Sequence, residues 1–156
     1  LAKKPRRPGA KLAWHQDQGY WPTGTPDTRT VTCSLAIDDS LKPNGCLRCI
    51  SGSGVAGVLR PHRSVTGSRE KCHTLEADVW AQDSIEYLEV RRGGITVHDE
   101  WVVHGSAGNP TDDWRRTYVI AYRSLATVEY ERSIGFTHSH NDAINWTTTL
   151  GAFQES

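Results

Sequence analysis

The chain has 156 residues, and 18 Lys and Arg balance 18 Asp and Glu, so the formal net charge is zero. This balance gives no reason to expect a nucleic-acid partner, and no apolar run approaches the roughly 18–20 residues of a membrane span. The basic start, LAKKPRRPGAK, also lacks the apolar stretch of a signal peptide.

Short strands are predicted along most of the chain, in segments where β-branched or aromatic residues lie between Gly, Pro, Asn and Asp. These segments are 12–20, 30–37, 46–51, 85–90, 95–103 and 116–124. Asn44-Gly45 supplies a turn with positive φ before the third of them. No repeat and no amphipathic helix is evident. The pattern predicts a single domain, residues 1–156, built as a double-sheet jelly roll or barrel.

Residues 52–84 mix Gly, Ser, Arg and His with little periodicity. They predict a long loop with at most one short strand near 75–80, which would suit a cover over a site. His62 in this loop is expected to be solvated or to act as a cap.

The four cysteines, at 33, 46, 49 and 72, include one C-x-x-C pair, Cys46 and Cys49. A structural zinc site would need a second pair, and a redox pair would open a helix, whereas GCLRCI is typical of a strand. We therefore expect reduced structural thiols and a cytoplasmic, reducing compartment.

His15 and Asp17 are two residues apart in a predicted strand, so both should point to one face, about 7 Å apart. His104 closes a later strand and could supply a third ligand from a distant part of the chain. Two imidazoles and one carboxylate leave Fe(II) three open positions, enough for a bidentate oxo-acid and O₂. The rival set His98, Glu100 and His104 also shares a face by alternation, but it would splay along one strand.

Arg115 opens the segment RRTYVIAYR. If Arg115 points inward, so do the small residues Thr117, Val119 and Ala121. An inward guanidinium is costly alone, but it suits a carboxylate held by two parallel hydrogen bonds.

Four segments in order carry a family resemblance: WHQD-x-GYWP, SLAIDDSLKPNGCLRCISGS, GGITVHDEWVVHGSAGN and WRRTYVIAYR. Over residues 13–124 the sequence resembles the phytanoyl-CoA dioxygenase-like family of Fe(II)/2-oxoglutarate oxygenases. The resemblance implies an all-β, cupin-like fold, a double-stranded β-helix or distorted jelly roll with few short helices. Members of the family carry a longer N-terminal region, so we expect that the chain lacks part of this supporting region.

The resemblance also implies roles for individual residues. It implies iron bound by His15, Asp17 and His104, and 2-oxoglutarate gripped at its distal carboxylate by Arg115 with help from Ser106. The remaining candidates are Thr32 and Ser34 for cosubstrate contacts, and Trp21, His98 and Trp101 for the substrate pocket.

The implied activity is hydroxylation of an unactivated C–H bond in a small organic molecule, using O₂ and converting 2-oxoglutarate to succinate and CO₂. Two alternatives remain open at this point. One is a non-oxidative metal-dependent cupin-like enzyme, and the other is a jelly-roll binding module without catalysis. No residue selects among acyl, amino-acid-derived and natural-product substrates.

Overall fold

The computed structural model describes residues 2–22, 24–25, 27–65 and 75–136. The chain divides into two compact units, one of residues 1–21 and 28–123 and one of residues 22–27 and 124–156. Cys72 lies outside the described residues. The described helices are too short or too polar to cross a bilayer.

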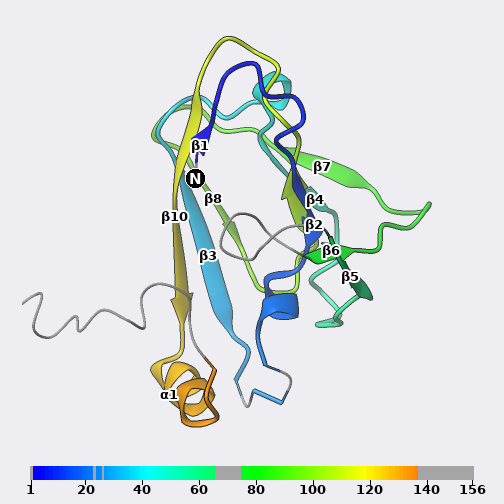
Figure 1. Ribbon diagram of the computed structural model, residues 1–156, viewed down its shortest axis with the longest axis vertical. Coiled ribbons are helices and arrows are strands. Elements are labelled where there is room, and N and C mark those ends of the chain that lie inside the picture. The colour runs from blue at the N-terminus through cyan, green and yellow to red at the C-terminus, as the bar shows by residue number, and fades with distance from the viewer. Residues whose placement is uncertain (1, 23, 26, 66–74, 137–156) are drawn as a thin grey trace, which may run out of the picture. The chain divides into compact units, whose positions relative to one another are not determined.

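The first unit contains two antiparallel four-stranded sheets (Figure 1). The first sheet has the order β1 (Ala2–Lys3), β10 (Arg115–Arg123), β3 (Thr30–Ala36), β8 (Ile95–His98). The second has the order β2 (Leu12–His15), β9 (His104–Ser106), β4 (Leu47–Ile50), β7 (Ile85–Leu88). A small ribbon pairs β5 (His62–Ser64) with β6 (Leu75–Ala77). Two 3₁₀ turns, η1 (Asp17–Tyr20) and η2 (Lys42–Asn44), complete the unit.

The strand pairings are nested: β1 pairs with β10, β2 with β9, β3 with β8 and β4 with β7. The first half of the chain therefore runs alongside the second half as one long hairpin, wrapped so that its strands alternate between the sheets. This topology confirms the predicted all-β jelly roll. It also makes β2 and β9 neighbours in one sheet, so segments about ninety residues apart in sequence meet by hydrogen bonding.

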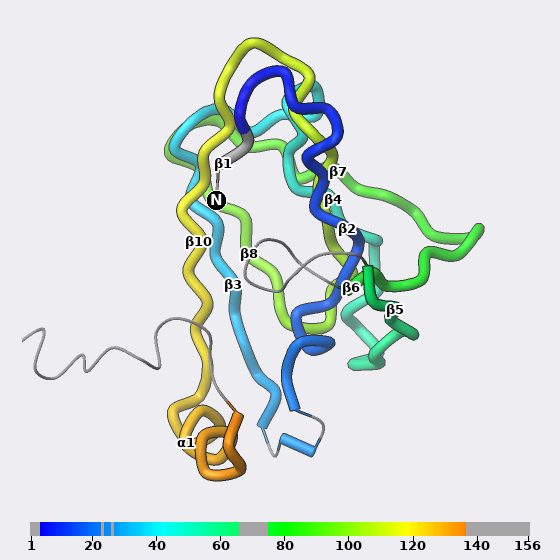
Figure 2. The backbone as a smooth tube through the Cα atoms, viewed as in Figure 1, coloured from blue at the N-terminus to red at the C-terminus, as the bar shows by residue number. Residues whose placement is uncertain are grey.

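Two predicted strands are wrong in extent. The segment 12–20 is a strand only to His15 and then turns into η1. The segment 95–103 is a strand only to His98, because the Asp99 carboxylate accepts hydrogen bonds from the backbone N–H groups of Trp101 and Val102 and forms a tight turn. Figure 2 follows the chain through this turn from β8 in one sheet to β9 in the other.

The two faces of the first sheet differ in character. Thr30, Thr32 and Arg115 point toward the second sheet and are buried. The opposite face carries exposed apolar side chains, namely Val31, Leu35, Ile95, Val97 and Tyr122. Behind the second sheet a small core joins Ile50, Ala77 and Val103, with Trp14 packed against it. The turn at Asn44-Gly45 has the predicted positive φ, +79° at Gly45.

The second unit contains the helix α1 (Leu125–Ser133), which the sequence did not predict. Its buried residues are Thr127 and Glu131, one turn apart, rather than apolar ones. Their hydroxyl and carboxylate groups bond to the Asp27 carbonyl and the Thr25 hydroxyl. A polar buried face gives no hydrophobic periodicity, so the helix left no signal.

Candidate metal and cosubstrate site

His15, Asp17 and His104 come together at one end of the β2–β9 pair. Their ligand atoms all lie within 4.8 Å of one another. His15 is the last residue of β2 and stands directly opposite His104, the first residue of β9. Asp17 opens η1, so it reaches the same point from a turn and not from the strand face that alternation predicts.

A β-bulge aims His15. Leu12 pairs with Ser106 and His15 pairs with His104, so three steps on β2 oppose two steps on β9. The extra residue reverses the alternation of β2, and both Leu12 and His15 then line the cavity between the sheets. Gly105 makes the pairing close, because a Cβ at this position would stand 2.9 Å from the Leu12 carbonyl oxygen.

The hydrogen bonds of both histidines fix their tautomers. Nδ1 of His15 lies 2.8 Å from the Ala13 carbonyl, and Nδ1 of His104 lies 2.9 Å from the Val102 carbonyl. A carbonyl only accepts, so each Nδ1 carries a proton, and in the neutral ring it is Nε2 that presents a lone pair. The two Nε2 atoms lie 3.6 and 3.7 Å from Asp17 Oδ1. Three electron-pair donors therefore converge at a point that suits a cation.

The charge states fit such a cation. Burial, with repulsion from His15 and His98, lowers the pKa of His104 to about 3, which leaves this imidazole neutral at physiological pH. Burial alone would raise the pKa of Asp17, but its contact with His15 and the nearby histidines outweigh burial and lower that pKa. Two imidazoles and one carboxylate are a ligand set that Fe(II) accepts.

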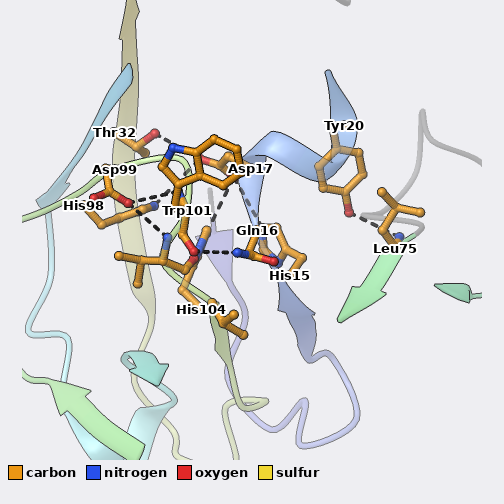
Figure 3. A network of polar contacts seen from close by, with 12 residues as sticks. His15, Gln16, Asp17, Tyr20, Thr32, Leu75, His98, Asp99, Trp101 and His104 are labelled. Atoms are coloured by element: carbon orange, nitrogen blue, oxygen red, sulfur yellow. Dashed lines mark hydrogen bonds and ion pairs between the residues drawn. The ribbon is translucent and has the colours of Figure 1, made fainter. Parts of the chain in front are cut away.

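Thr32 and His98 approach the other oxygen of Asp17 (Figure 3). The Thr32 hydroxyl donates to Oδ2 at 3.1 Å, and His98 Nε2 lies 3.8 Å from the same atom. Thr32 therefore holds the carboxylate so that Oδ1 faces the two histidines. His98 is only 8% exposed, and neither of its ring nitrogens has a hydrogen-bond partner among the described residues.

The rival set of His98, Glu100 and His104 does not assemble. The Asp99 turn places His98 and His104 on different sheets, and their ring centroids still lie 4.2 Å apart, so Glu100 is the member that does not join them. The Glu100 carboxylate is buried elsewhere and accepts the backbone N–H of Thr30 at 2.9 Å. Strict alternation along 95–103 was the wrong assumption, because the strand ends at His98.

A second, anion-seeking site surrounds Arg115 on β10. Its side chain is buried, with the residue 3% exposed, and neither Nε nor Nη2 has a hydrogen-bond partner in the described part of the chain. The Ser106 hydroxyl, buried in the same small cavity, also lacks a partner there. Ser34, Thr96 and Thr117 line this cavity as well.

No neighbouring carboxylate balances Arg115 in the described residues. The thiol of Cys46 is close, but burial raises its pKa to about 11, so it stays protonated. Burial disfavours the charged form of Arg115 and therefore lowers the pKa of its guanidinium. A buried guanidinium with two open donors and a nearby hydroxyl is suited to one carboxylate.

A larger cavity of about 580 Å³ lies between the two sheets and contains the metal-seeking cluster in its wall. Among the sequence candidates, Trp21, Thr32, Ser34 and His98 line it. Trp101 is not among the residues that line this cavity. Its backbone N–H donates to Asp99, and its carbonyl accepts from Gln16. The other lining residues include the apolar and aromatic side chains Leu12, Tyr20, Leu47, Val119 and Ala121.

Sequence reasoning missed two residues beside the metal-seeking cluster. Gln16 is completely buried and bonds to three backbone groups. His62 was expected to be solvated or to act as a cap, and its Nε2 accepts the backbone N–H of Gln16, just before η1, at 3.2 Å. The only feature of the sequence that pointed to Gln16 was its position between two candidate ligands. Nothing in the pattern of the loop indicated a role for His62.

Comparison with known proteins places these features in a family. A family model described as phytanoyl-CoA dioxygenase (PhyH) matches residues 1–117. The probable alpha-ketoglutarate-dependent hypophosphite dioxygenase of Stutzerimonas stutzeri is 34% identical over 119 residues, covering 73% of this chain and 40% of that protein. Phytanoyl-CoA dioxygenase domain-containing protein 1 of Mus musculus is 34% identical over 114 residues, covering 72% and 39%. The chain thus spans about two fifths of the length of these curated relatives.

Solved structures agree with this assignment. AviO1 from Streptomyces viridochromogenes Tue57 is 31% identical with a TM-score of 0.57, covering 81% of this chain and 48% of that one. EvdO2 from Micromonospora carbonacea var. aurantiaca, solved with 2-oxoglutarate, is 27% identical with a TM-score of 0.62, covering 77% and 47%. From the family match over most of its length and the shared fold, the chain belongs to the phytanoyl-CoA dioxygenase (PhyH) family.

Proposed function

We propose that this chain carries the iron and 2-oxoglutarate sites of an oxygenase that acts on a small organic molecule. One observation carries the proposal. The three candidate metal ligands lie at one end of the short strand β9, and the buried Arg115 guanidinium, which suits an anion, lies at the other end. β9 supplies His104 to the first site and Ser106 to the second.

The metal would be held by His15 Nε2, Asp17 Oδ1 and His104 Nε2. These three atoms already lie within 4.8 Å of one another. Bound there, Fe(II) would supply the capacity to activate O₂. The protein's own contribution is to keep the ligands neutral or anionic as required and to fix Asp17 through Thr32.

The distal carboxylate of 2-oxoglutarate would occupy the small cavity. Arg115 would donate through Nε and Nη2, and Ser106 would donate its hydroxyl proton. This pairing would satisfy donors that are otherwise buried without partners, which is costly in a folded protein. Ser34, which lines both cavities, is a further contact that we propose for the cosubstrate.

The substrate would bind in the larger cavity, against Tyr20 and Trp21, with His98 as a polar contact. We propose hydroxylation of a C–H bond as the reaction. The relative from Stutzerimonas stutzeri is named for hypophosphite, an inorganic anion. The cavity walls favour an organic substrate, because most of the described side chains around the cluster are apolar or aromatic.

The test measures binding and turnover separately. Co(II) binding is followed by its absorption, 2-oxoglutarate binding by calorimetry with Co(II) present, and succinate release with Fe(II) and O₂. The variants are His15→Ala, Arg115→Met and, as a matched control, Arg116→Met, because the Arg116 guanidinium points outward and bonds to Asp38.

We expect His15→Ala to lose Co(II) binding. Arg115→Met should keep Co(II) but bind 2-oxoglutarate at least ~30-fold more weakly, because a buried charge pair loses one partner. Arg116→Met should resemble the wild type. Metal binding without any effect of 2-oxoglutarate would favour a non-oxidative metal enzyme. A wild type that binds neither would reject the proposal.

A further inference from the structure

The segment Val58–His62 holds the backbone that carries two of the proposed iron ligands. The segment is hydrogen-bonded to this backbone through Gln16, which lies between His15 and Asp17 in the sequence and is 0% exposed. Gln16 Nε2 donates to the carbonyls of Val58 at 2.8 Å and Trp101 at 2.7 Å, and its Oε1 accepts the N–H of Arg60 at 2.8 Å. One side-chain amide thus joins three segments of the chain. Figure 3 shows its bond to Trp101.

The bond to Trp101 gives this arrangement its importance. Trp101 lies in the turn that leads into His104, so Gln16 links the segment of the first ligand histidine to that of the second. Val58 and Arg60 supply the remaining bonds to the same amide. The spacing of His15 and His104 therefore depends on contacts outside the β2–β9 ladder.

His62 secures the same backbone from behind. Its Nδ1 lies 2.7 Å from the Arg60 carbonyl, so Nδ1 carries the proton and Nε2 accepts the N–H of Gln16. The ring rests on Gly19 in η1, where a Cβ would stand 3.1 Å from Nε2. His62 therefore touches the turn that carries Asp17 at two points, a hydrogen bond and a close packing contact.

The segment is itself firmly anchored. The Arg60 guanidinium makes two hydrogen bonds to the Asp83 carboxylate, at 2.6 and 2.9 Å, and a third to the Asp78 carbonyl. It also lies 3.9 Å from the centre of the Trp80 ring. Both side chains of the ion pair are buried. The segment that bonds to Gln16 is thus itself held in place by the contacts of Arg60.

We propose that His62, acting through Gln16, is a positioning residue of the metal site. It fixes the backbone between His15 and Asp17 and so sets the geometry in which the three ligands meet. This inference rests on the proposed metal site. It assigns to part of the predicted loop 52–84 a structural role toward the ligands in place of a cover.

The test compares Co(II) affinity with metal-free stability in four variants. His62→Leu removes the acceptor for the Gln16 N–H, and His62→Gln keeps an acceptor at that reach. Gly19→Ala leaves every hydrogen-bonding group intact but presses on the His62 ring. Arg63→Leu is the control, since Arg63 is the next residue on β5 and its side chain is exposed.

We expect His62→Leu and Gly19→Ala to weaken Co(II) binding roughly 10-fold or more, as changes behind metal ligands commonly do. His62→Gln should recover most of that loss, and Arg63→Leu should match the wild type. The titration is done well below the melting temperature, so that lowered stability alone does not move the dissociation constant.

The inference is overturned if His62→Leu melts earlier yet binds Co(II) as the wild type does. If His62→Leu does not fold, Gly19→Ala decides in the same way. Failure of the underlying proposal looks different: the wild type would then bind Co(II) no better than His15→Ala.

Discussion

Asp17 shows how a single carboxylate serves two directions at once. Its Oδ1 faces the Nε2 atoms of His15 and His104, and its Oδ2 accepts the Thr32 hydroxyl. The hydroxyl comes from β3 in the opposite sheet, so the carboxylate is steered from across the interior. A contact between the Thr32 hydroxyl and the cosubstrate would therefore compete with the hydrogen bond of this hydroxyl to Asp17.

Substitution of Thr32 tests this steering. We expect Thr32→Val, which keeps the shape but removes the hydroxyl, to weaken Co(II) binding by about 10-fold, within the range usual for partners of metal ligands. Thr32→Ser keeps the hydroxyl and should retain most of the affinity. A Thr32→Val protein with normal Co(II) affinity but weak 2-oxoglutarate binding would instead assign Thr32 to the cosubstrate.

At the scale of elements, the turn between β8 and β9 decides which residues reach the site. Asp99 is exposed, yet its Oδ1 holds the N–H groups of Trp101 and Val102 at 2.9 and 3.0 Å. The turn moves the chain from one sheet to the other within five residues. It thereby puts His98 and His104 on different sheets, with their ring centroids 4.2 Å apart, and brings the Trp101 carbonyl to Gln16.

We expect Asp99→Ala to destabilise the protein by about 1–2 kcal/mol, because two backbone donors lose a charged acceptor. Asp99→Asn keeps the acceptor oxygen and should lose less than half as much. Urea unfolding of the metal-free proteins measures both. Equal losses for the two variants would mean that charge, not the hydrogen-bonded turn, is what Asp99 provides.

The sequence predicted the strands and the kinds of ligand, but not the details that aim them. His15 and Asp17 stood out through their spacing in a predicted strand, and His104 and Arg115 through their places in later strands. The family resemblance implied their roles together. The bulge in β2 is set by pairing with a distant strand, which local alternation does not contain. The break after His98 is set by the Asp99 turn, which strict alternation also overlooks. His62 is placed by contacts more than forty residues away in sequence.

Across the whole first unit, the two ligand histidines and Arg115 come from different sheets. His15 and His104 lie in the sheet of β2 and β9, whereas Arg115 lies in the sheet of β10 and β3. A ligand that binds the metal at one end and Arg115 at the other would therefore tie the two sheets together. Metal alone would reinforce only one of them and the turn beside it.

Thermal unfolding makes this visible. At ligand concentrations about 100-fold above Kd, linkage predicts ~2.7 kcal/mol of stabilisation, or roughly 5–10 °C in Tm for a domain of this size. We expect Co(II) alone to raise Tm, 2-oxoglutarate alone to change it little, and the two together to add a further increment. Arg115→Met should abolish only that increment. A full increment in Arg115→Met would place the acid elsewhere.

If the proposed sites are occupied as described, β9 would set the length of the oxo-acid that fits. His104 and Ser106 stand on the same side of a three-residue strand, so the two grips are separated by one strand repeat of about 6.7 Å. A side chain at Gly105 would collide with the backbone of β2. This close packing keeps the distance between His104 and Ser106 fixed. Acids one methylene shorter or longer, oxaloacetate and 2-oxoadipate, should therefore release far less product than the five-carbon acid under identical conditions.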